Sequence, residues 1–442
     1  MATIRMTKGN IFKQLLFYSI PLILGNLFQL TYNAIDSIIV GKFIGKEALA
    51  AVGTASPVMN IIILGISGLC IGASVIMSEF YGANNEAMVK KEMATTSVFG
   101  FYFSSLLAIL GMMLAPYLLR ALQVPEAILP TATTYLRLTF LGAPFTFFYN
   151  AIATALKSVG DSKTPLKFLA FAAVLNGVLD IILIGLLGFG IVCSALTTVF
   201  AQAVSAILCI RYVYRNIPIL QLKMSEFKIT PSLLKQTLKY GSITALQQSV
   251  QPVDKLLIQG AINPLGIDVI ATFNAVNRID DYAFTPEQSI SHGITTFVAQ
   301  NRGARELQRI RKGLRTGLFL EFLYWIFICS AITIFKEPLL RLFSTKGDQS
   351  IITVGSSYLG LMAVFYLLPA FTNGMQGFFR GMGKMKTTLI GTILQTSLRV
   401  LFVYLLTPTH GIQGVAYACA IGWTCMLIFE FIMAKRTSKL QI

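Results

Sequence analysis

The feature that most constrains this chain is a weak internal repeat. Residues 45–91 align without a gap with residues 266–312, which lie 221 positions later. In this alignment Gly45, Ala50, Gly72, Gly82, Ala83 and Lys91 recur as Gly266, Ala271, Gly293, Gly303, Ala304 and Lys312. Later segments match at nearly the same shift, as in Asn150 and Asn373. Two similar halves of this size are typical of membrane transporters that bind their substrate between the repeats.

Long apolar runs indicate that both halves lie in a membrane. Of the 442 residues, 55% are hydrophobic and only 12% are charged, and the mean hydropathy is +0.69. About 20 apolar residues in a helix cross a hydrocarbon core of about 30 Å. The chain contains twelve such runs: residues 14–40, 48–78, 94–119, 130–156, 165–187, 191–213, 233–261, 268–299, 313–336, 351–378, 386–407 and 413–434. We therefore predict an all-α polytopic membrane protein with twelve transmembrane helices. Because six spans return a chain to the same side, the two six-helix repeats should be parallel.

The distribution of basic residues gives the orientation and argues against a nucleic-acid partner. The chain has 36 Lys and Arg against 19 Asp and Glu, for a net charge of +17. With the N-terminus inside, 26 of these 36 basic residues fall in cytoplasmic segments, six fall outside and four fall within spans. This split follows the positive-inside rule, so the excess charge reflects topology. We expect a multi-pass protein of the cell membrane with both termini in the cytoplasm.

The longest cytoplasmic connection divides the chain into two lobes. It is basic and polar, and it contains Pro218 and Pro231, which break helices. We predict an N-terminal six-helix lobe at residues 1–215, an interlobe linker at 216–239 and a C-terminal six-helix lobe at 240–442.

Several classes of function lack the residues that they need. The segment from Gly381 to Lys384 lacks the spacing of a nucleotide-binding loop, so we expect no ATPase subunit and an ion gradient as the energy source. The six cysteines have no metal-ligand or redox spacing. No nucleophile, base or metal set converges in the sequence. We therefore expect neither an enzyme nor a bound cofactor or metal.

Two acids in the N-terminal half are the first candidates for a functional site. A charge in the middle of a bilayer costs on the order of 3 kcal/mol, so an acid there needs a reason. Asp36 ends a polar stripe on the first span that includes Gln29 and Asn33, and Asp180 lies four residues after Asn176 on the fifth span. Both spans run outward, so the two acids lie at similar depth and could share a pocket suited to carrying protons. A structural hydrogen bond or ion pair at each acid is the alternative.

Pro21 lies in the middle of the first span. It removes a backbone hydrogen bond there and creates a bend point. The bend is either structural only or coupled to the protonation of Asp36 a few turns away.

The C-terminal half mixes acids with bases. The seventh span, the counterpart of the first, places Gln251 and Asp254 on one face with Lys255 beside them, and the eighth span carries Arg278 and Asp281. Because opposite charges neutralise one another when buried, we assign ion coupling to the N-terminal lobe and interpret this network as structural or substrate-contacting. The candidate substrate and network residues are Gln29, Asn33, Asn150, Gln251, Asp254, Lys255, Arg278 and Asp281.

These features together resemble the multidrug and toxic compound extrusion (MATE) family over about residues 10–435. The resemblance rests on the twelve spans in two parallel halves, on Pro21 and Asp36 in the first span, and on the pair formed by Asn176 and Asp180. It implies an all-helical, V-shaped transporter. It also implies a network linked to H⁺ or Na⁺ that consists of Asp36, Tyr135, Asn176, Asp180 and Thr198. If the coupling ion is Na⁺, these residues except the tyrosine would hold it.

The C-terminal lobe departs from the family pattern. Some members bind a cation between a lone acid of the seventh span and an acid of the tenth. Here Asp254 is followed by Lys255, and the tenth span, residues 351–378, contains no acid. The sequence therefore argues against a sodium site in this lobe.

The resemblance predicts an antiporter that exports organic cations and amphipathic drugs in exchange for H⁺ or Na⁺. Protonation of Asp36 and Asp180 from outside would change the bend of the first span and disfavour substrate binding. We expect a monomer in the lipid bilayer with small-molecule substrates. The alternative is a flippase of lipid-linked precursors or polysaccharides from the same superfamily, which would favour extra spans and a strongly cationic cavity.

Overall fold

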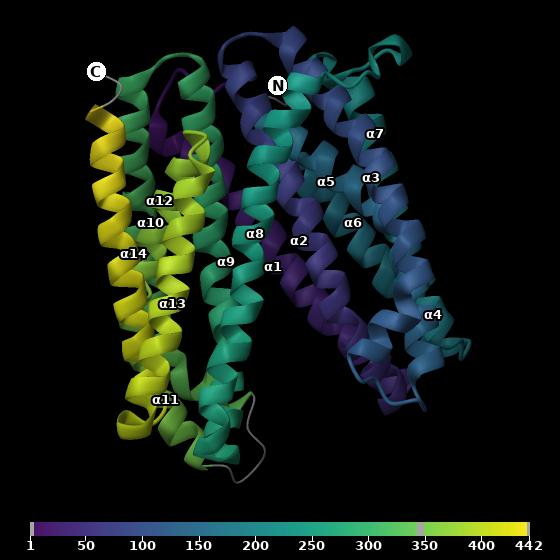
Figure 1. Cartoon of the computed structure of the whole chain (residues 1–442), viewed down its shortest axis with the longest axis vertical. Helices are drawn as coiled ribbons and strands as arrows, with labels where there is room; N and C mark the ends of the chain where they lie inside the picture. The colour runs from purple at the N-terminus through teal and green to yellow at the C-terminus, as the bar shows by residue number, and fades with distance from the viewer. Residues whose placement is uncertain (1–3, 343–348, 440–442) are drawn as a thin grey trace. The chain divides into compact units, whose positions relative to one another are not determined.

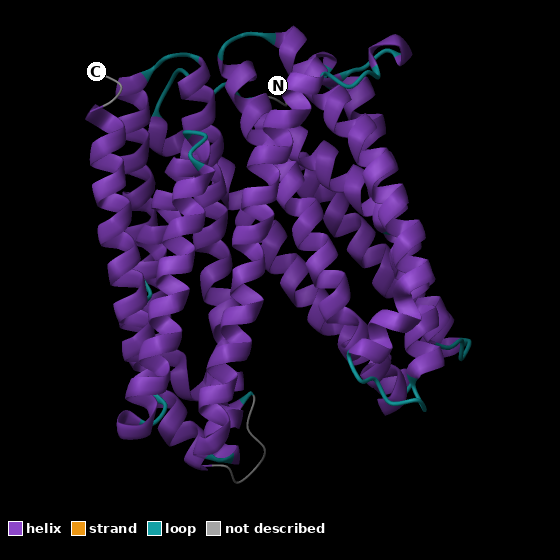
Figure 2. Cartoon of the chain, in the orientation of Figure 1, coloured by secondary structure: helices purple, strands orange, loops and turns teal. Residues whose placement is uncertain are grey.

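The structure is a computed structural model that describes residues 4–342 and 349–439. Within these ranges the side chains at positions 36–38, 40, 41, 46, 47, 49, 349, 350, 438 and 439 lie outside the described part. All regular secondary structure in the described residues is helical (Figure 2). The prediction of an all-α protein is confirmed.

Each predicted span corresponds to one helix or to a consecutive pair (Figure 1). The first half contains α1 (Ile11–Phe43), α2 (Lys46–Gly82), α3 (Glu86–Ala121), α4 (Leu129–Leu141) with α5 (Ala143–Ser158), α6 (Lys163–Asp180) with the π-helix η1 (Ile181–Leu186), and α7 (Ile191–Asn216). The second half contains α8 (Pro231–Ile262), α9 (Ile267–Gly303), α10 (Leu307–Arg341), α11 (Gln349–Phe365) with α12 (Leu367–Gly381), α13 (Met385–His410) and α14 (Gln413–Lys439). Three short 3₁₀ helices lie in the connections: η2 (Pro218–Leu220), η3 (Met224–Glu226) and η4 (Asn263–Leu265).

Most of these helices are long and apolar enough to cross a membrane. Nine of the described spans meet that requirement by length and composition, and α4 with α5 would make a tenth that bends by 41°. The remaining two, α8 and α9, are long but less apolar, because they carry five acids and five bases between them.

The bend between α4 and α5 follows from two residues at the break. Pro144 lies in the first turn of α5, and a proline disfavours helical geometry in the residue before it. Gly142 lies between the two helices, and a Cβ at this position would come within 2.8 Å of the Val199 side chain on α7. The glycine therefore lets the bent span approach α7 closely.

The contacts within the described residues define two compact units. The first unit contains residues 24–245 and the short segment that ends at Arg5, and the second contains residues 6–23 and 246–442. The boundaries fall inside α1 and α8. The first unit therefore includes the first part of α8, and the second unit includes the first part of α1. The sequence-based lobes at 1–215 and 240–442 concern which parts move together, and they stay a prediction.

Small residues allow these exchanged helix segments to pack closely. In the first unit, a Cβ at Gly72 on α2 would lie 2.7 Å from the backbone nitrogen of Gly241 on α8. In the second unit, a Cβ at Gly293 on α9 would lie 2.6 Å from Oγ of Ser19 on α1. Gly72 and Gly293 are equivalent in the internal repeat. Both halves thus use the same glycine position for a close helix contact, as small residues do in membrane proteins.

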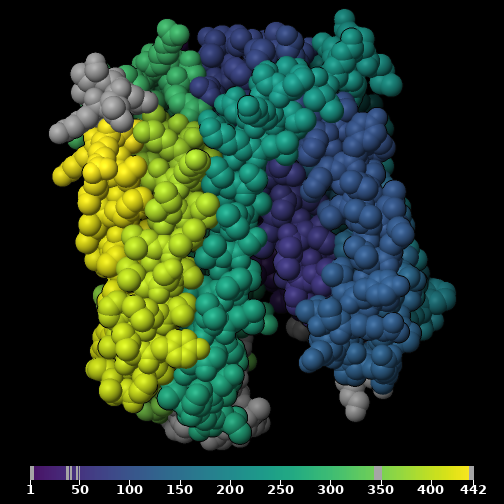
Figure 3. Space-filling model, viewed as in Figure 1, coloured from purple at the N-terminus to yellow at the C-terminus, as the bar shows by residue number. Residues whose placement is uncertain are grey.

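Large apolar side chains remain exposed on the outer helices. In the second unit, α13 and α14 lie side by side and cover one face, which Figure 3 shows. Exposed apolar residues on this face include Ile393, Leu401 and Leu405 of α13 and Ile428 and Ile432 of α14. In a chain with this many apolar spans, such a surface faces lipid.

Candidate functional site

A buried polar group of the first unit lies at the end of α6. Asn176 and Asp180 are four residues apart on one face of this helix and are only 1% and 0% exposed. Thr197 of α7 donates a hydrogen bond of 2.5 Å from Oγ1 to Oδ1 of Asp180. Among the described residues, neither polar atom of the Asn176 side chain has a hydrogen-bond partner. A buried amide with free bonding capacity beside a buried acid is a polar site that an ion or proton could complete.

The helix changes type directly after this acid. Asp180 ends α6, and the π-helix η1 starts at Ile181. Single turns of π-helix are rare and occur often at functional sites, because they reposition the side chains of the preceding turn. The local backbone therefore singles out Asp180 independently of its burial.

The structure distinguishes between two neighbouring threonines. Thr198, which the sequence predicts to belong to the ion-linked network, donates to the backbone carbonyl of Ser194 at 2.9 Å. Thr197, which the sequence analysis did not single out, contacts Asp180 directly. The signal that could have found Thr197 is its helical phase relative to the buried face of α7, which includes Ser194 and Ala201.

The contacts of α1 run along α6 and η1. A Cβ at Gly25 on α1 would lie 2.8 Å from Leu166 of α6, and the Phe43 ring of α1 lies 3.4 Å from the position of a Cβ at Gly185 of η1. Along α1, position 36 lies between Gly25 and Phe43. Along α6 and η1, Asp180 lies between Leu166 and Gly185. The side chain of Asp36 itself lies outside the described part. The sharing of one pocket by Asp36 and Asp180 therefore stays a prediction, and the packing of the two helices supports it.

Other predicted residues of the first unit are placed as follows. Pro21 is buried within α1, two residues before the unit boundary. Gln29 and Asn33 are exposed on α1. Tyr135 packs with the apolar cluster around Leu136 on α4, which borders α7. Asn150 donates from Nδ2 to the carbonyl of Thr146 on its own helix at 2.8 Å, and its place in a substrate site stays a prediction.

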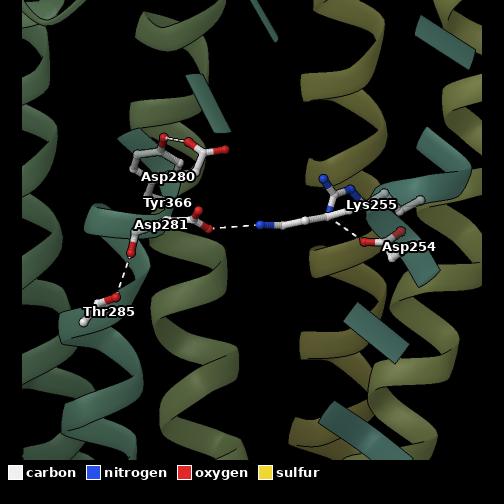
Figure 4. Close-up of polar contacts among 7 residues, drawn as sticks. Asp254, Lys255, Asp280, Asp281, Thr285 and Tyr366 are labelled. Atoms are coloured by element: carbon white, nitrogen blue, oxygen red, sulfur yellow. Dashed lines mark hydrogen bonds and ion pairs between the residues drawn. The ribbon is translucent and has the colours of Figure 1, made fainter. Parts of the chain in front are cut away.

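The second unit contains two ion pairs of different exposure (Figure 4). Asp254 of α8 pairs with Arg399 of α13 at 2.8 Å, and both side chains are largely buried. Lys255 of α8 pairs with Asp281 of α9 at 3.0 Å, with 56% and 37% of the side chains exposed. Adjacent residues of α8 thus bind to two different helices.

A third acid of this group is held by a tyrosine. The Tyr366 hydroxyl, at the junction of α11 and α12, donates to a carboxylate oxygen of the buried Asp280 (Figure 4). Gln251 and Arg278, two further predicted residues, are exposed on α8 and α9. The structure therefore brings Asp254, Lys255 and Asp281 into ion pairs and leaves Gln251 and Arg278 outside them.

In the part of the chain that the structure describes, no three His, Cys, Asp or Glu side chains are arranged so that they could hold a metal ion. The polar groups of both units are instead pairs of an acid with a hydroxyl, an amide or a base. Such groups suit a proton or a weakly held monovalent ion better than a tightly bound divalent metal.

Comparisons with known proteins match this arrangement. A family model described as MatE matches residues 21–182 and 243–405. The chain is 30% identical over 423 residues to YpnP, a probable multidrug resistance protein of Bacillus subtilis, with 94% of this chain and 93% of that protein covered. It is 22% identical over 442 residues to the multidrug export protein MepA of Staphylococcus aureus, with 98% and 96% covered.

Solved structures match over the full length. One is described as the outward-facing conformation of a multidrug resistance MATE family transporter of the MOP superfamily. It has a TM-score of 0.93 and 24% sequence identity to this chain, and the alignment covers 100% of this chain and 99% of that one. At this identity the likeness establishes the fold, which is the twelve-span fold that the sequence predicts.

Proposed function

The chain belongs to the MatE family of membrane transporters, which are not enzymes, and from this premise we propose that it exports cationic and amphipathic drugs in exchange for H⁺ or Na⁺. Relatives described as a multidrug resistance protein and a multidrug export protein support the substrate class. Export against a concentration gradient needs an energy source, and the sequence carries no nucleotide-binding loop. A gradient of H⁺ or Na⁺ is the source that remains.

The single observation that carries this proposal is the buried carboxyl group of Asp180. It is 0% exposed in a spanning helix, it accepts a hydrogen bond from Thr197, and Asn176 lies one turn away. An acid in this environment is costly to keep charged, so ionisable residues within spans mark ion or proton pathways. We assign the coupling ion to Asp36, Asn176 and Asp180, with Tyr135 nearby. Thr197, which donates to Asp180, takes the place in this network that the sequence analysis gave to Thr198.

The polar stripe on α1 supplies the second part of the proposal. Gln29 and Asn33 are exposed on a helix that is otherwise apolar. Amide side chains in a spanning helix are stable when they face water or polar groups rather than lipid. We propose that these two side chains, together with Asn150, face the path of the substrate.

Coupling follows if the ion and the substrate favour different conformations. Protonation of Asp36 and Asp180 from outside removes the charges that attract a cationic substrate, and α1 can change its bend at Pro21. A ligand shifts a conformational equilibrium only by its difference in affinity for the two states. Exchange therefore requires that proton and drug compete for one bistable element, which we propose is α1.

The orientation and the assembly are also part of the proposal. The 26-to-6 split of basic residues supports a cell-membrane protein with both termini in the cytoplasm. The two units come from one chain, and each contains its own apolar core. This supports a monomer as the working form.

Transport measurements on the purified protein in liposomes test the proposal. A pH gradient and a sodium gradient are imposed separately, and the efflux of a small panel of cationic dyes is followed. We expect that one of the two gradients drives dye movement, and that Asp36→Asn and Asp180→Asn each abolish it. Glu126→Gln, which alters an exposed acid of the same unit, is the matched control and should leave transport intact.

Two results would contradict this function. Proton- or sodium-driven efflux that persists in Asp36→Asn or Asp180→Asn would exclude the proposed coupling site. Translocation of a lipid-linked precursor in the absence of dye efflux would favour the flippase alternative.

A further inference from the structure

Two glutamates in the second unit are buried, and among the described residues neither has a basic partner. Glu287 lies on α9 and Glu321 lies on α10, two helices that pack against each other, and both side chains are 0% exposed. Within the described residues, neither carboxyl oxygen of Glu321 has a hydrogen-bond partner, nor does Oε1 of Glu287. The remaining oxygen of Glu287 accepts a bond of 3.3 Å from Nδ2 of Asn373.

Both glutamates lie beside one turn of α12. Asn373 of this turn contacts Glu287, and the Cγ of Glu321 lies 3.6 Å from the position that a Cβ would take on the next residue, Gly374. The charges of the two glutamates also act on each other. Since Gly374 has no side chain, this turn of α12 leaves room for the Glu321 side chain.

Two buried carboxylates on packed helices, without a basic partner among the described residues, cannot both remain charged at an acceptable cost. Each would lose its hydration, and the two would repel each other without a cation to offset them. One proton bound by either carboxyl group removes a charge and adds one hydrogen-bond donor next to oxygens that lack a partner in the described residues. The pair is therefore suited to bind one proton.

The internal repeat shows that the fold does not need these acids. The positions equivalent to Glu287, Glu321 and Gly374 in the first half are Ile66, Gly100 and Ala151. There the Phe147 ring fills the space, so closely that a Cβ at Gly100 would lie 1.7 Å from it, and Ile66, Phe147 and Ala151 share one apolar cluster. Helices of the same arrangement thus pack well without charge, which argues against a purely structural role for the acid pair.

A row of ionisable groups connects the pair with the exposed part of the unit. Asp280 lies two turns before Glu287 on the same face of α9, and the charges of these two acids act on each other. Beside Asp280, the partly exposed Asp281 binds Lys255 (Figure 4). Further ionisable groups interact with this row from the neighbouring helices: Tyr324 of α10, Tyr358 of α11, Tyr366 between α11 and α12, Arg399 of α13 and Cys419 of α14.

We propose that Glu287 and Glu321 form a second proton-binding site, within the second unit, that takes up one proton through Asp281 and Asp280. The first candidate site at Asp180 belongs to the other unit, so the two sites are separate. Only the use of this second proton in transport rests on the proposed antiport. The binding of the proton does not, and it can be measured without any transport.

Infrared spectroscopy on the purified protein in lipid nanodiscs tests the proposal. A protonated carboxyl group in an apolar site gives a C=O stretching band, and glutamate labelled with ¹³C shifts this band in the wild-type protein without a mutation. We expect a glutamate band that disappears as the pH is raised, and that is lost in Glu321→Gln and in Glu287→Gln. Proton uptake, followed with a pH indicator, should fall by about one proton per protein in either variant, because the pair titrates as a unit.

Glu430 of α14 provides the matched control. It is also 0% exposed, and neither of its oxygens has a hydrogen-bond partner in the described residues, but the charge of Arg380 acts on it. Glu430→Gln should therefore leave the band and the proton count unchanged. Asp180→Asn should leave the glutamate band unchanged, because the ¹³C label is on glutamate alone.

Three results would overturn the proposal. One is the absence of a ¹³C-sensitive carboxyl band at any pH in the wild-type protein. This result would exclude a protonated glutamate even if a variant failed to fold. Another is a band and a proton count that persist in the Glu287→Gln/Glu321→Gln double variant. The third is loss of the band on adding Na⁺ at constant pH, which would assign the pair to a metal cation instead. Failure of drug export with the band intact would contradict only the proposed antiport.

Discussion

Thr197 donates a hydrogen bond of 2.5 Å from its hydroxyl to the buried carboxyl group of Asp180, and this contact joins α7 to the end of α6. The next residue, Thr198, turns its hydroxyl to the carbonyl of Ser194 in its own helix. Two adjacent threonines therefore have different roles around the same candidate site. This difference gives a test that compares residues of identical chemistry.

We expect Thr197→Val to reduce ion-driven export about tenfold, and Thr198→Val to leave it nearly unchanged. A hydrogen bond to a charged group contributes about 1.5–3 kcal/mol, and about 1.4 kcal/mol corresponds to a factor of ten. Valine keeps the size of threonine and removes only the hydroxyl. The measurement is the initial rate of dye efflux from liposomes under a fixed gradient. Equal rates in the two variants would remove Thr197 from the site, and a larger loss in Thr198→Val would restore the residue that the sequence favours.

The helices could be predicted well from the sequence because the signal repeats many times along each one. A span of about 20 apolar residues tolerates a few exceptions, so all twelve predicted spans correspond to helices. The breaks inside spans were not predicted. The bend at Gly142 and the π-helix after Asp180 are local features of a few residues each, and such features leave no periodic pattern in the sequence.

The site was harder to predict because it depends on single residues and on partners distant in sequence. Asp180 and Asn176 stand out as polar residues on an apolar helix, whereas choosing between Thr197 and Thr198 needs the rotation of α7 about its axis. Glu321 was missed, although it is the only acid in the predicted span at residues 313–336. A lone acid in an apolar span is the signal that could have found it.

The ion pair between Asp254 and Arg399 should matter far more for stability than the one between Lys255 and Asp281. The first pair is largely buried, so Asp254→Asn or Arg399→Gln leaves an uncompensated charge and should destabilise the protein by about 3–5 kcal/mol. The second pair is about half exposed and should contribute at most about 1 kcal/mol.

Thermal unfolding of the purified variants in detergent measures this difference. The Asp254→Asn/Arg399→Gln double variant should recover part of the loss, since it leaves no lone charge. Lys255→Gln and Asp281→Asn are the matched exposed variants. A double variant as unstable as the sum of its single changes would show that the two buried side chains are not coupled.

The close contact between α2 and α8 should make Gly72 sensitive to substitution by a larger residue. A Cβ at Gly72 would lie 2.7 Å from the backbone nitrogen of Gly241, and the backbone, unlike the end of a long side chain, cannot move aside. We therefore expect Gly72→Ala to destabilise the protein by about 1–3 kcal/mol, the usual cost of overpacking. Gly65→Ala on the same helix is the matched control, because no atom of the described residues lies within 4 Å of the position that a Cβ would take there. Alanine also favours a helix by about 1 kcal/mol over glycine.

Unfolding temperatures that fall for Gly72→Ala and rise or hold for Gly65→Ala would confirm that α8 is anchored to α2 by this contact. Equal unfolding temperatures for both variants would contradict it, since α8 lies against Gly72 and not against Gly65.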